Sequence, residues 1–160
     1  MAIRQRKIVS NYLKVDEEFE LLGTGFTELS ESFSPQTTSK RYINSSASTQ
    51  SITGYEWSTP FTADQIVSNE AIDFIKNIGE MQLVGTDVET EYIIVDLDRP
   101  STIEGDFHAR KFNVAISVDS TEDNDGELGL SGNFLGQSEP IEGTFTISTK
   151  EFVAGFTPAV

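Results

Sequence analysis

The sequence predicts a mainly β fold, in which an antiparallel β-sandwich or part-open barrel carries one flanking α-helix. Three observations support this prediction. Hydrophobic and polar residues alternate in several segments, turn-forming residues separate those segments, and one stretch has the spacing of an amphipathic helix. Strands and one helix in 160 residues fit a single domain, residues 1–160, with one core.

The N-terminal segment is basic. Its charged residues before Asp16 are all cations: Arg4, Arg6, Lys7 and Lys14. A basic chain end is most often a solvated terminus. The alternative is a basic N-terminal arm, residues 1–15, that contacts acidic groups on a neighbouring copy.

Residues 40–52 form a long polar tract, which leads directly into the strand with the only Trp. A short candidate strand, residues 19–23, precedes this tract. In residues 50–66 the alternating pattern places five residues on one face of an extended chain: Thr53, Tyr55, Trp57, Phe61 and Ala63. Pro60 interrupts this region and predicts an edge strand or a bend.

One helix is expected over residues 68–81. The hydrophobic residues at i, i+3, i+4 and i+7 are Ala71, Phe74, Ile75 and Ile78. Ser68 can cap the helix, Glu70 suits the positive end of its dipole, and Gly79 offers a stop.

The C-terminal half predicts a four-stranded meander, residues 90–152. The segment RKFNVAISVD places Phe112, Val114, Ile116 and Val118 on one face and Lys111, Asn113, Ala115 and Ser117 on the other. The same scheme is expected for three further sets: Ile93, Val95 and Leu97; Leu128, Leu130 and Phe134; Phe145 and Ile147. Asp125-Gly126 predicts a tight turn between the second and third strands. The polar face of the meander carries small uncharged residues, which suit either an ordinary wet surface or close packing against something else.

Composition excludes several classes of function. With 37% hydrophobic residues and eleven Phe the chain can fold, and a net charge of -15 disfavours tight binding to nucleic acid. The absence of Cys removes disulfides, thiolate metal sites and thiol nucleophiles. No membrane span or signal peptide is apparent, so synthesis in the cytoplasm is expected.

Catalytic and metal-binding patterns are poorly matched. An EF-hand alignment of residues 121–132 puts Thr121 at the first ligand position and Gly132 at the twelfth, where a bidentate Glu is needed. No pair of carboxylates stands out among the 26 acids. His108 fits a partly packed strand end better than a catalytic role. No G-x-S-x-G elbow occurs, and residues 23–29 lack the G-K-[ST] ending of a phosphate loop. We therefore expect no enzyme activity, catalytic residue, metal or cofactor.

Tyr55 and Trp57 permit two interpretations. Aromatic residues on one strand face can stack on sugar rings or bases, but they more often serve a core or a subunit interface.

Four segments carry a family resemblance over nearly the whole chain. They are the start RQRKIVSNYLKV, the tract SKRYINSSASTQSITGYEWSTPFTADQI, the helix SNEAIDFIKNIG, and the ending ARKFNVAISVDSTEDNDGELGLSGNF with GTFTISTK. In this order they resemble the major tail tube protein of long-tailed bacteriophages and prophages, particularly those of Gram-positive bacteria. The resemblance rests on the overall pattern and not on a catalytic signature.

The resemblance implies a structural protein of the virion tail. In that family a β-sandwich with a flanking helix closes into six-membered rings, and the rings stack into a hollow tube. DNA leaves the capsid through this tube, whose subunits contribute strands to a continuous inner β-barrel. The implied partners are further copies and other tail proteins, with DNA passing through the bore without specific binding and no membrane involved.

The resemblance also assigns expected surfaces. A long hairpin loop reaches from one ring toward the next in that family, and residues 40–52 match its position. The residues expected at assembly interfaces are Arg4, Arg6, Lys7, Lys40, Arg41, Asn44, Gln50, Tyr55 and Trp57. Those expected to face the lumen are Asn113, Ser117, Asp119, Asp123 and Asp125.

Three alternatives remain open at this stage. The inner tube of a contractile tail or phage-derived bacteriocin shares the fold, and a neighbouring sheath gene would distinguish it. A monomeric glycan-binding β-sandwich using Tyr55 and Trp57 would lose sugar binding on Trp57→Ala. A hydrolase with paired acids would show pH-dependent turnover that single Asp or Glu substitutions abolish.

Overall fold

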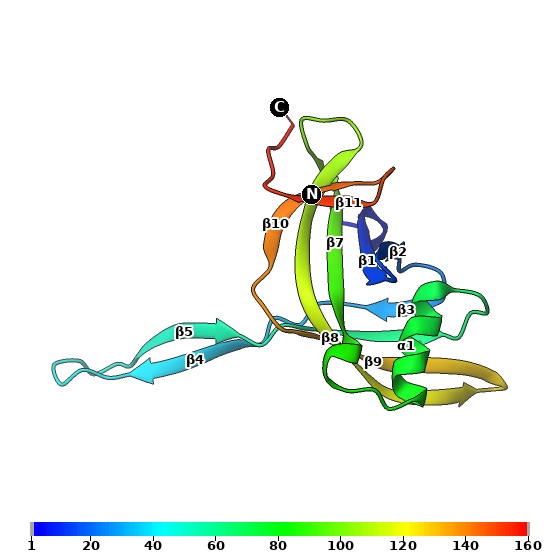
Figure 1. Cartoon of the computed structure of the whole chain (residues 1–160). Helices are drawn as coiled ribbons and strands as arrows, with labels where there is room; N and C mark the ends of the chain where they lie inside the picture. Colours follow the sequence, from blue (N-terminus) through cyan, green and yellow to red (C-terminus); the bar gives the residue numbers. More distant parts are fainter. Residues whose placement is uncertain (1, 160) are drawn as a thin grey trace.

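The computed structural model describes residues 2–159 and confirms a mainly β fold with one flanking helix. A nine-stranded antiparallel sheet curls into a half-barrel, and α1 packs against one of its faces (Figure 1). We call this the helix-side face. A separate two-stranded ribbon projects from the rest of the molecule (Figure 1). We call this ribbon, residues 35–55, the arm, and the remaining described residues the body.

The regular elements follow one another with short connections. In chain order they are η1 (Arg6–Ile8), β1 (Val9–Val15), β2 (Glu18–Leu21), β3 (Phe26–Leu29), β4 (Pro35–Lys40), β5 (Thr49–Tyr55), β6 (Ser58–Asp64), α1 (Glu70–Glu80), η2 (Gly85–Val88), β7 (Glu89–Pro100), β8 (Asp106–Asn124), β9 (Glu127–Gly136), β10 (Ile141–Thr146) and β11 (Glu151–Ala154), where η marks a 3-10 turn. None of the helices among residues 2–159 is long and apolar enough to cross a membrane.

The sheet order is β2-β1-β7-β8-β9-β6-β3, with β10 and β11 branching from β8. The predicted meander is correct for β7, β8 and β9 but wrong for β10, which pairs with β8 instead of β9. The reason is the length of β8, which spans 19 residues. Because β9 covers β8 only from Val114 to Asn124, residues 106–111 keep a free edge that β10 occupies.

The main core lies between the helix-side face and α1. Its fully buried side chains include Leu13, Tyr92, Phe112, Leu130 and Phe134 from the strands and Ile72 and Ile75 from the helix. The predicted helix is confirmed with three local differences. Asn69, not Ser68, caps it by accepting from the Ile72 amide at 3.1 Å; Ile72 is buried, whereas Phe74 is only partly buried; and Gly79 does not end it. Gly79 instead allows close approach to β8, since an added Cβ would lie 2.7 Å from Val118 Cγ1.

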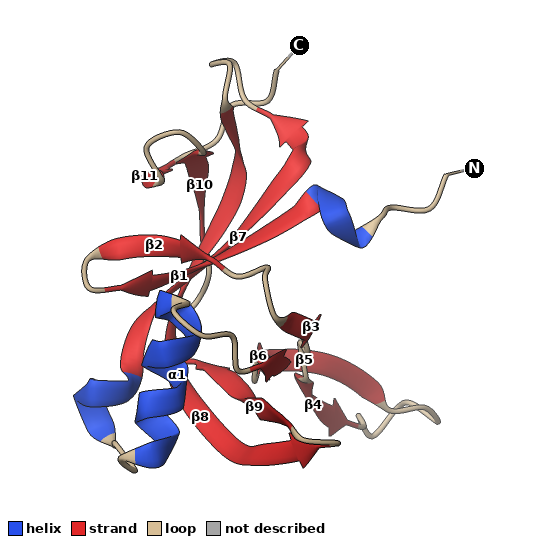
Figure 2. Ribbon diagram, turned by 90° about the vertical axis from the view of Figure 1, so that its right-hand side faces the viewer, coloured by secondary structure: helices blue, strands red, loops and turns tan. Residues whose placement is uncertain are grey.

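A smaller core lies on the opposite face, beneath β10 and β11. It contains Tyr12, Ile93, Val95, Ala109 and Phe145. The central strand β7 is therefore buried on both faces. The sequence pattern of its odd-numbered residues alone predicts burial of only one face. Figure 2 shows α1 and the β10–β11 pair at opposite ends of the body.

The prediction for one strand residue is wrong. Leu128 was expected inside but is 57% exposed, because it lies at the tip of the β8–β9 hairpin beyond the core. Pro60 does not interrupt β6, but it lies at a local edge: β9 pairs with it on one side, whereas the β3 ladder on the other side ends opposite Phe61. The carbonyl of Pro60 accepts from the Ser30 amide at 3.4 Å, so its ring nitrogen faces the side where β3 has already ended at Leu29, and the missing N–H leaves no ladder bond broken.

We expect Gly132→Ala to lower the free energy of unfolding by about 1–3 kcal/mol. A Cβ at this position of β9 would collide with the backbone carbonyl of Ser117 on β8, which cannot move without disturbing the bulge beside it. Urea unfolding followed by the fluorescence of Trp57 measures the change. Gly54→Ala in β5 is the matched control, because nothing lies within 4 Å of an added Cβ there. Equal stability of the two variants would contradict the packing argument.

Candidate assembly surface

The arm is an exposed ribbon of two antiparallel strands. β4 and β5 pair from Pro35↔Tyr55 to Lys40↔Thr49, and every residue of β4 is exposed. Of the polar tract predicted as a loop, residues 40–52, only residues 41–48 lie outside the strands. The correction follows from the β-branched content of the flanks, whose Thr and Ile residues favour pairing over an irregular loop.

The tip of the arm combines cations with exposed apolar groups. Lys40 and Arg41 are the only charged residues of the arm. Tyr42 is 55% exposed and Ile43 fully exposed. The Ser45 amide donates to the Tyr42 carbonyl at 3.1 Å, and the Arg41 Nε donates to the Ser45 carbonyl at 3.3 Å. These local bonds shape the tip, while Asn44 and Gln50 lie exposed beside it.

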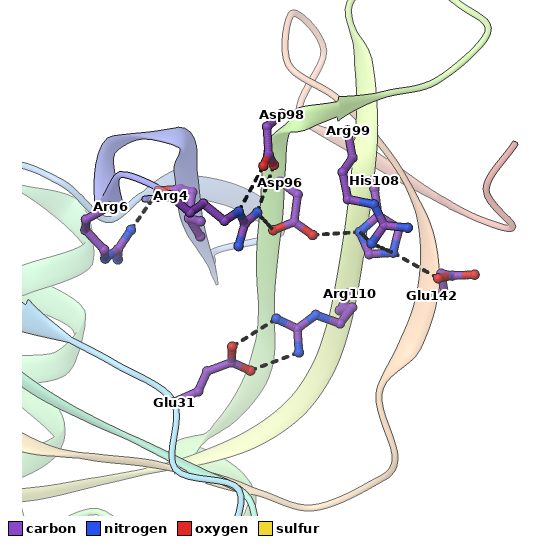
Figure 3. A network of polar contacts seen from close by, with 10 residues as sticks. Arg4, Arg6, Glu31, Asp96, Asp98, Arg99, His108, Arg110 and Glu142 are labelled. Carbon is purple, nitrogen blue, oxygen red and sulfur yellow. Dashed lines mark hydrogen bonds and ion pairs between the residues drawn. The ribbon is translucent and has the colours of Figure 1, made fainter. Parts of the chain in front are cut away.

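Trp57 anchors the base of the arm. Its ring stacks on Phe112 with centroids 4.0 Å apart and planes 11° apart, and its N–H donates to Glu31 at 3.0 Å. Glu31 also accepts from both terminal nitrogens of Arg110, at 3.0 and 2.9 Å (Figure 3). One face and the only donor of the indole ring are therefore engaged within the chain. Tyr55, by contrast, is 63% exposed.

A hollow of about 570 Å³ lies beside this base. Aromatic side chains and a polar segment before β10 line it: Phe33, Tyr55, Trp57, Phe112, Gln137, Ser138 and Glu139, together with Arg110, Pro140 and two glycines. Its size and apolar lining are those of a binding site for a small group or a few side chains.

The basic N-terminal segment contacts its own chain. Arg4 donates to Asp96 at 2.8 Å and to both carboxylate oxygens of Asp98 at 2.8 and 2.9 Å (Figure 3). Arg6 donates to the carbonyls of Val9 and Leu29 and to the side chain of Asn11. Lys7 is exposed. Since β1 begins at Val9, only residues 2–8 of the predicted arm 1–15 precede the first strand.

His108 lies at the centre of the polar network on the helix-side face. It is only 3% exposed, with Nδ1 2.7 Å from Asp96 Oδ2 and Nε2 2.9 Å from Glu142 Oε2 (Figure 3). A protonated imidazole can donate to both carboxylates at once. Phe156 packs edge-on against the ring. The predicted place near a strand end is confirmed, since β8 begins at Asp106, but the ring is buried and not partly packed. The sequence signal for this buried polar network was Asp96, because a charged residue lies there on the same face of the strand as the buried Tyr92 and Ile94.

The residues expected to face the lumen divide into two groups. Asn113 and Ser117 lie on β8, on the side away from α1, and Asn113 donates to Ser138 at 3.2 Å. Asp119, Asp123 and Asp125 lie along the exposed end of the β8–β9 hairpin. Asp123 accepts from the Gly126 amide at 2.7 Å, and Asp125 and Gly126 have φ of 54° and 91°, which confirms the predicted tight turn. Their orientation toward a bore stays a prediction.

Within residues 2–159, no group of three or more His, Asp or Glu side chains is arranged so that it could hold a metal ion.

Comparison with known proteins identifies the fold. No protein-family model and no curated protein sequence matches the chain. Solved structures do match, and two of them are chains of gene transfer agent particles. The first is a chain of the "tail of empty GTA particle computed with helical refinement, C6 symmetry", with a TM-score of 0.62 and 14% identity over 95% of this chain and 100% of that one. The second is a chain of the "virion of native gene transfer agent (GTA) particle", with a TM-score of 0.57, 14% identity and the same coverage. At this identity the likeness shows a shared fold.

We expect Asp96→Asn to destabilise the protein at neutral pH by about 1–3 kcal/mol, because a buried charged acceptor is lost. Burial alone would raise the pKa of Asp96, but hydrogen bonds from Arg4 and His108 outweigh it and lower that pKa. A folded-state pKa below the unfolded value of about 3.9 means that the carboxylate stabilises the fold above that pH. This contribution is lost as the pH falls through the lowered pKa.

Urea unfolding between about pH 7 and pH 2 tests this linkage. The wild-type protein should lose more stability on acidification than the Asp96→Asn variant. Asp125→Asn, at an exposed turn position where Asn is equally suited, is the control and should follow the wild-type curve. Parallel curves for wild type and Asp96→Asn would rule out a stabilising role for this carboxylate.

Proposed function

We propose that this chain is the structural subunit of a phage-like tail tube, in which six copies close into a ring and rings stack around a DNA-conducting bore. The supporting observation is the match of nearly the whole chain, in fold, to a chain of a tail with C6 symmetry. The order of sequence segments supports the same family independently.

The free edges of the sheet support ring formation. In the described sheet β2, β3 and β11 each have a neighbour on one side only. Exposed strand edges promote pairing with another chain, and closed symmetric assemblies remove them. Contributing such edges to a continuous inner barrel would satisfy backbone groups that the isolated subunit leaves to water.

The arm supports stacking between rings. A two-stranded ribbon is at best marginally stable in water, and this one packs against no other part of the described chain along β4. Contacts with a neighbouring ring would cover it. A polar surface keeps the arm soluble in the free subunit until those contacts form.

The acidity of the chain supports passage of DNA. A net charge of -15 produces a field that repels phosphates, so DNA slides without specific binding. The same features suit the inner tube of a contractile tail or a phage-derived bacteriocin, and a sheath gene beside this one would distinguish them.

Deleting residues 45–48 should leave a folded subunit that no longer forms tubes. These residues belong to the exposed end of the arm, outside both strands, so the core is untouched. Negative-stain electron microscopy at low and high protein concentration measures assembly. An unchanged urea midpoint relative to the wild-type protein controls for folding. Tubes of normal width and length from the deletion variant would contradict the role of the arm.

Changing acidic residues that are expected to face the lumen to lysine should slow DNA ejection and make the ejection rate more dependent on salt concentration. Asp119→Lys with Asp123→Lys adds cations that phosphates bind and that salt screens. Ejection from particles assembled with this variant, followed at several salt concentrations, measures the effect. Glu104→Lys with Glu151→Lys, two exposed acids outside the β8–β9 hairpin, is the control with the same net charge. An ejection rate with unchanged salt dependence would show that these acids do not face the DNA.

A further inference from the structure

The tip of the arm presents an apolar group with no cover in its own chain. Ile43 is fully exposed and Tyr42 is 55% exposed, at the far end of a ribbon that leads away from the body (Figure 1). Isolated exposed apolar residues are common, but here they occupy the end of a projecting element flanked by Lys40 and Arg41. A tip of this kind has the features of an interaction anchor, in which an apolar side chain is surrounded by charges that orient it.

The hollow at the arm base has complementary properties. Its aromatic walls come from Phe33, Tyr55, Trp57 and Phe112, and its volume of about 570 Å³ leaves room for apolar side chains of another segment. Phe33 and Tyr55 are 52% and 63% exposed, so burying them would remove apolar surface from water.

Charges around the hollow favour the binding of a basic segment. Arg110 lines the hollow but is neutralised by its two hydrogen bonds to Glu31. Glu139 lines the hollow, is exposed, and has no cation among the described residues paired with it. The uncompensated charge near the rim is therefore negative, opposite in sign to Lys40 and Arg41.

The geometry requires the two partners to belong to different copies. The hollow lies where the arm leaves the body and the tip lies at the opposite end of the same ribbon, so the tip cannot fold back into its own hollow (Figure 1). A contact between the tip of one copy and the hollow of a second leaves one tip and one hollow free. Such a head-to-tail contact repeats and builds an open chain of subunits.

We propose that Tyr42 and Ile43 at the arm tip of one copy insert into the aromatic hollow at the arm base of a second copy, with Lys40 and Arg41 facing Glu139. This inference rests on the proposed self-assembly of the chain and specifies which two surfaces meet. It assigns the hollow to a segment of this protein and not to a glycan.

Cysteine cross-linking tests the contact cleanly, because the chain contains no Cys. Tagged Ile43→Cys protein is mixed with untagged Ser138→Cys protein under assembly conditions and oxidised. Since Ser138 lines the hollow, a disulfide-linked dimer with one copy of each variant should form. Tagged Ile43→Cys mixed with Val153→Cys is the control, because Val153 is 64% exposed on β11, away from the arm base. We expect about tenfold more mixed dimer with Ser138→Cys, since docking raises the effective concentration.

Charge reversal provides a second test. Lys40→Glu with Arg41→Glu, introduced into the Ile43→Cys protein, should reduce the specific dimer to the control level. Adding Glu139→Lys to the Ser138→Cys protein should restore it. Failure of Glu139→Lys to restore the dimer would overturn the assigned orientation of the charges.

The possible outcomes separate this inference from the proposed function. Tubes of wild-type protein, together with equal cross-linking to Ser138→Cys and Val153→Cys, would overturn the docking contact and leave the tail tube proposal intact. A specific Ser138→Cys dimer without tubes would support the contact and count against the tube. Wild-type protein that stays monomeric, together with no specific dimer from the Ile43→Cys and Ser138→Cys pair, would overturn both.

Discussion

The long strand β8 is the constraint on which the rest of the structure depends. β8 spans 19 residues, and its two edges are paired differently. β7 pairs along residues 107–115 of one edge, while β9 and β10 share the other edge. This division makes β10 branch from the sheet and cover the opposite face, so β7 becomes buried on both sides. The curl of the sheet, its two cores and the position of the C-terminal strands all follow from how β8 is paired.

The helix-side face changes character where α1 ends. Under the helix it is apolar, with Phe112 and Val114 fully buried. Beyond the helix the same face carries Asp96 and His108, which are buried only because the N-terminal segment and β10 supply charged partners. Buried charges are tolerated when they are paired, so the termini of the chain are held in place by the same groups that they neutralise.

The arm joins a rigid base to an unsupported ribbon. Trp57, stacked on Phe112 and bonded to Glu31, fixes the point at which the arm leaves the body. Beyond this point β4 and β5 bond only to each other, and their side chains lie in water. A well-positioned but uncovered element suits a contact completed by a second copy, because little orientational freedom is left to lose when it docks.

Local patterns in the sequence determined the buried face of β8, the amphipathic helix and the Asp125-Gly126 turn, since each depends on residues that are near one another in the chain. Long-range pairing was decided only in the tertiary structure. That β10 joins β8, that Arg4 reaches Asp96 and that His108 lies between two carboxylates all require segments far apart in sequence to meet, and neither alternation nor helical spacing encodes which distant partner will fill a free edge or neutralise a charge. The aromatic hollow is of the same kind, because Phe33, Trp57 and Phe112 become neighbours only after the sheet has curled.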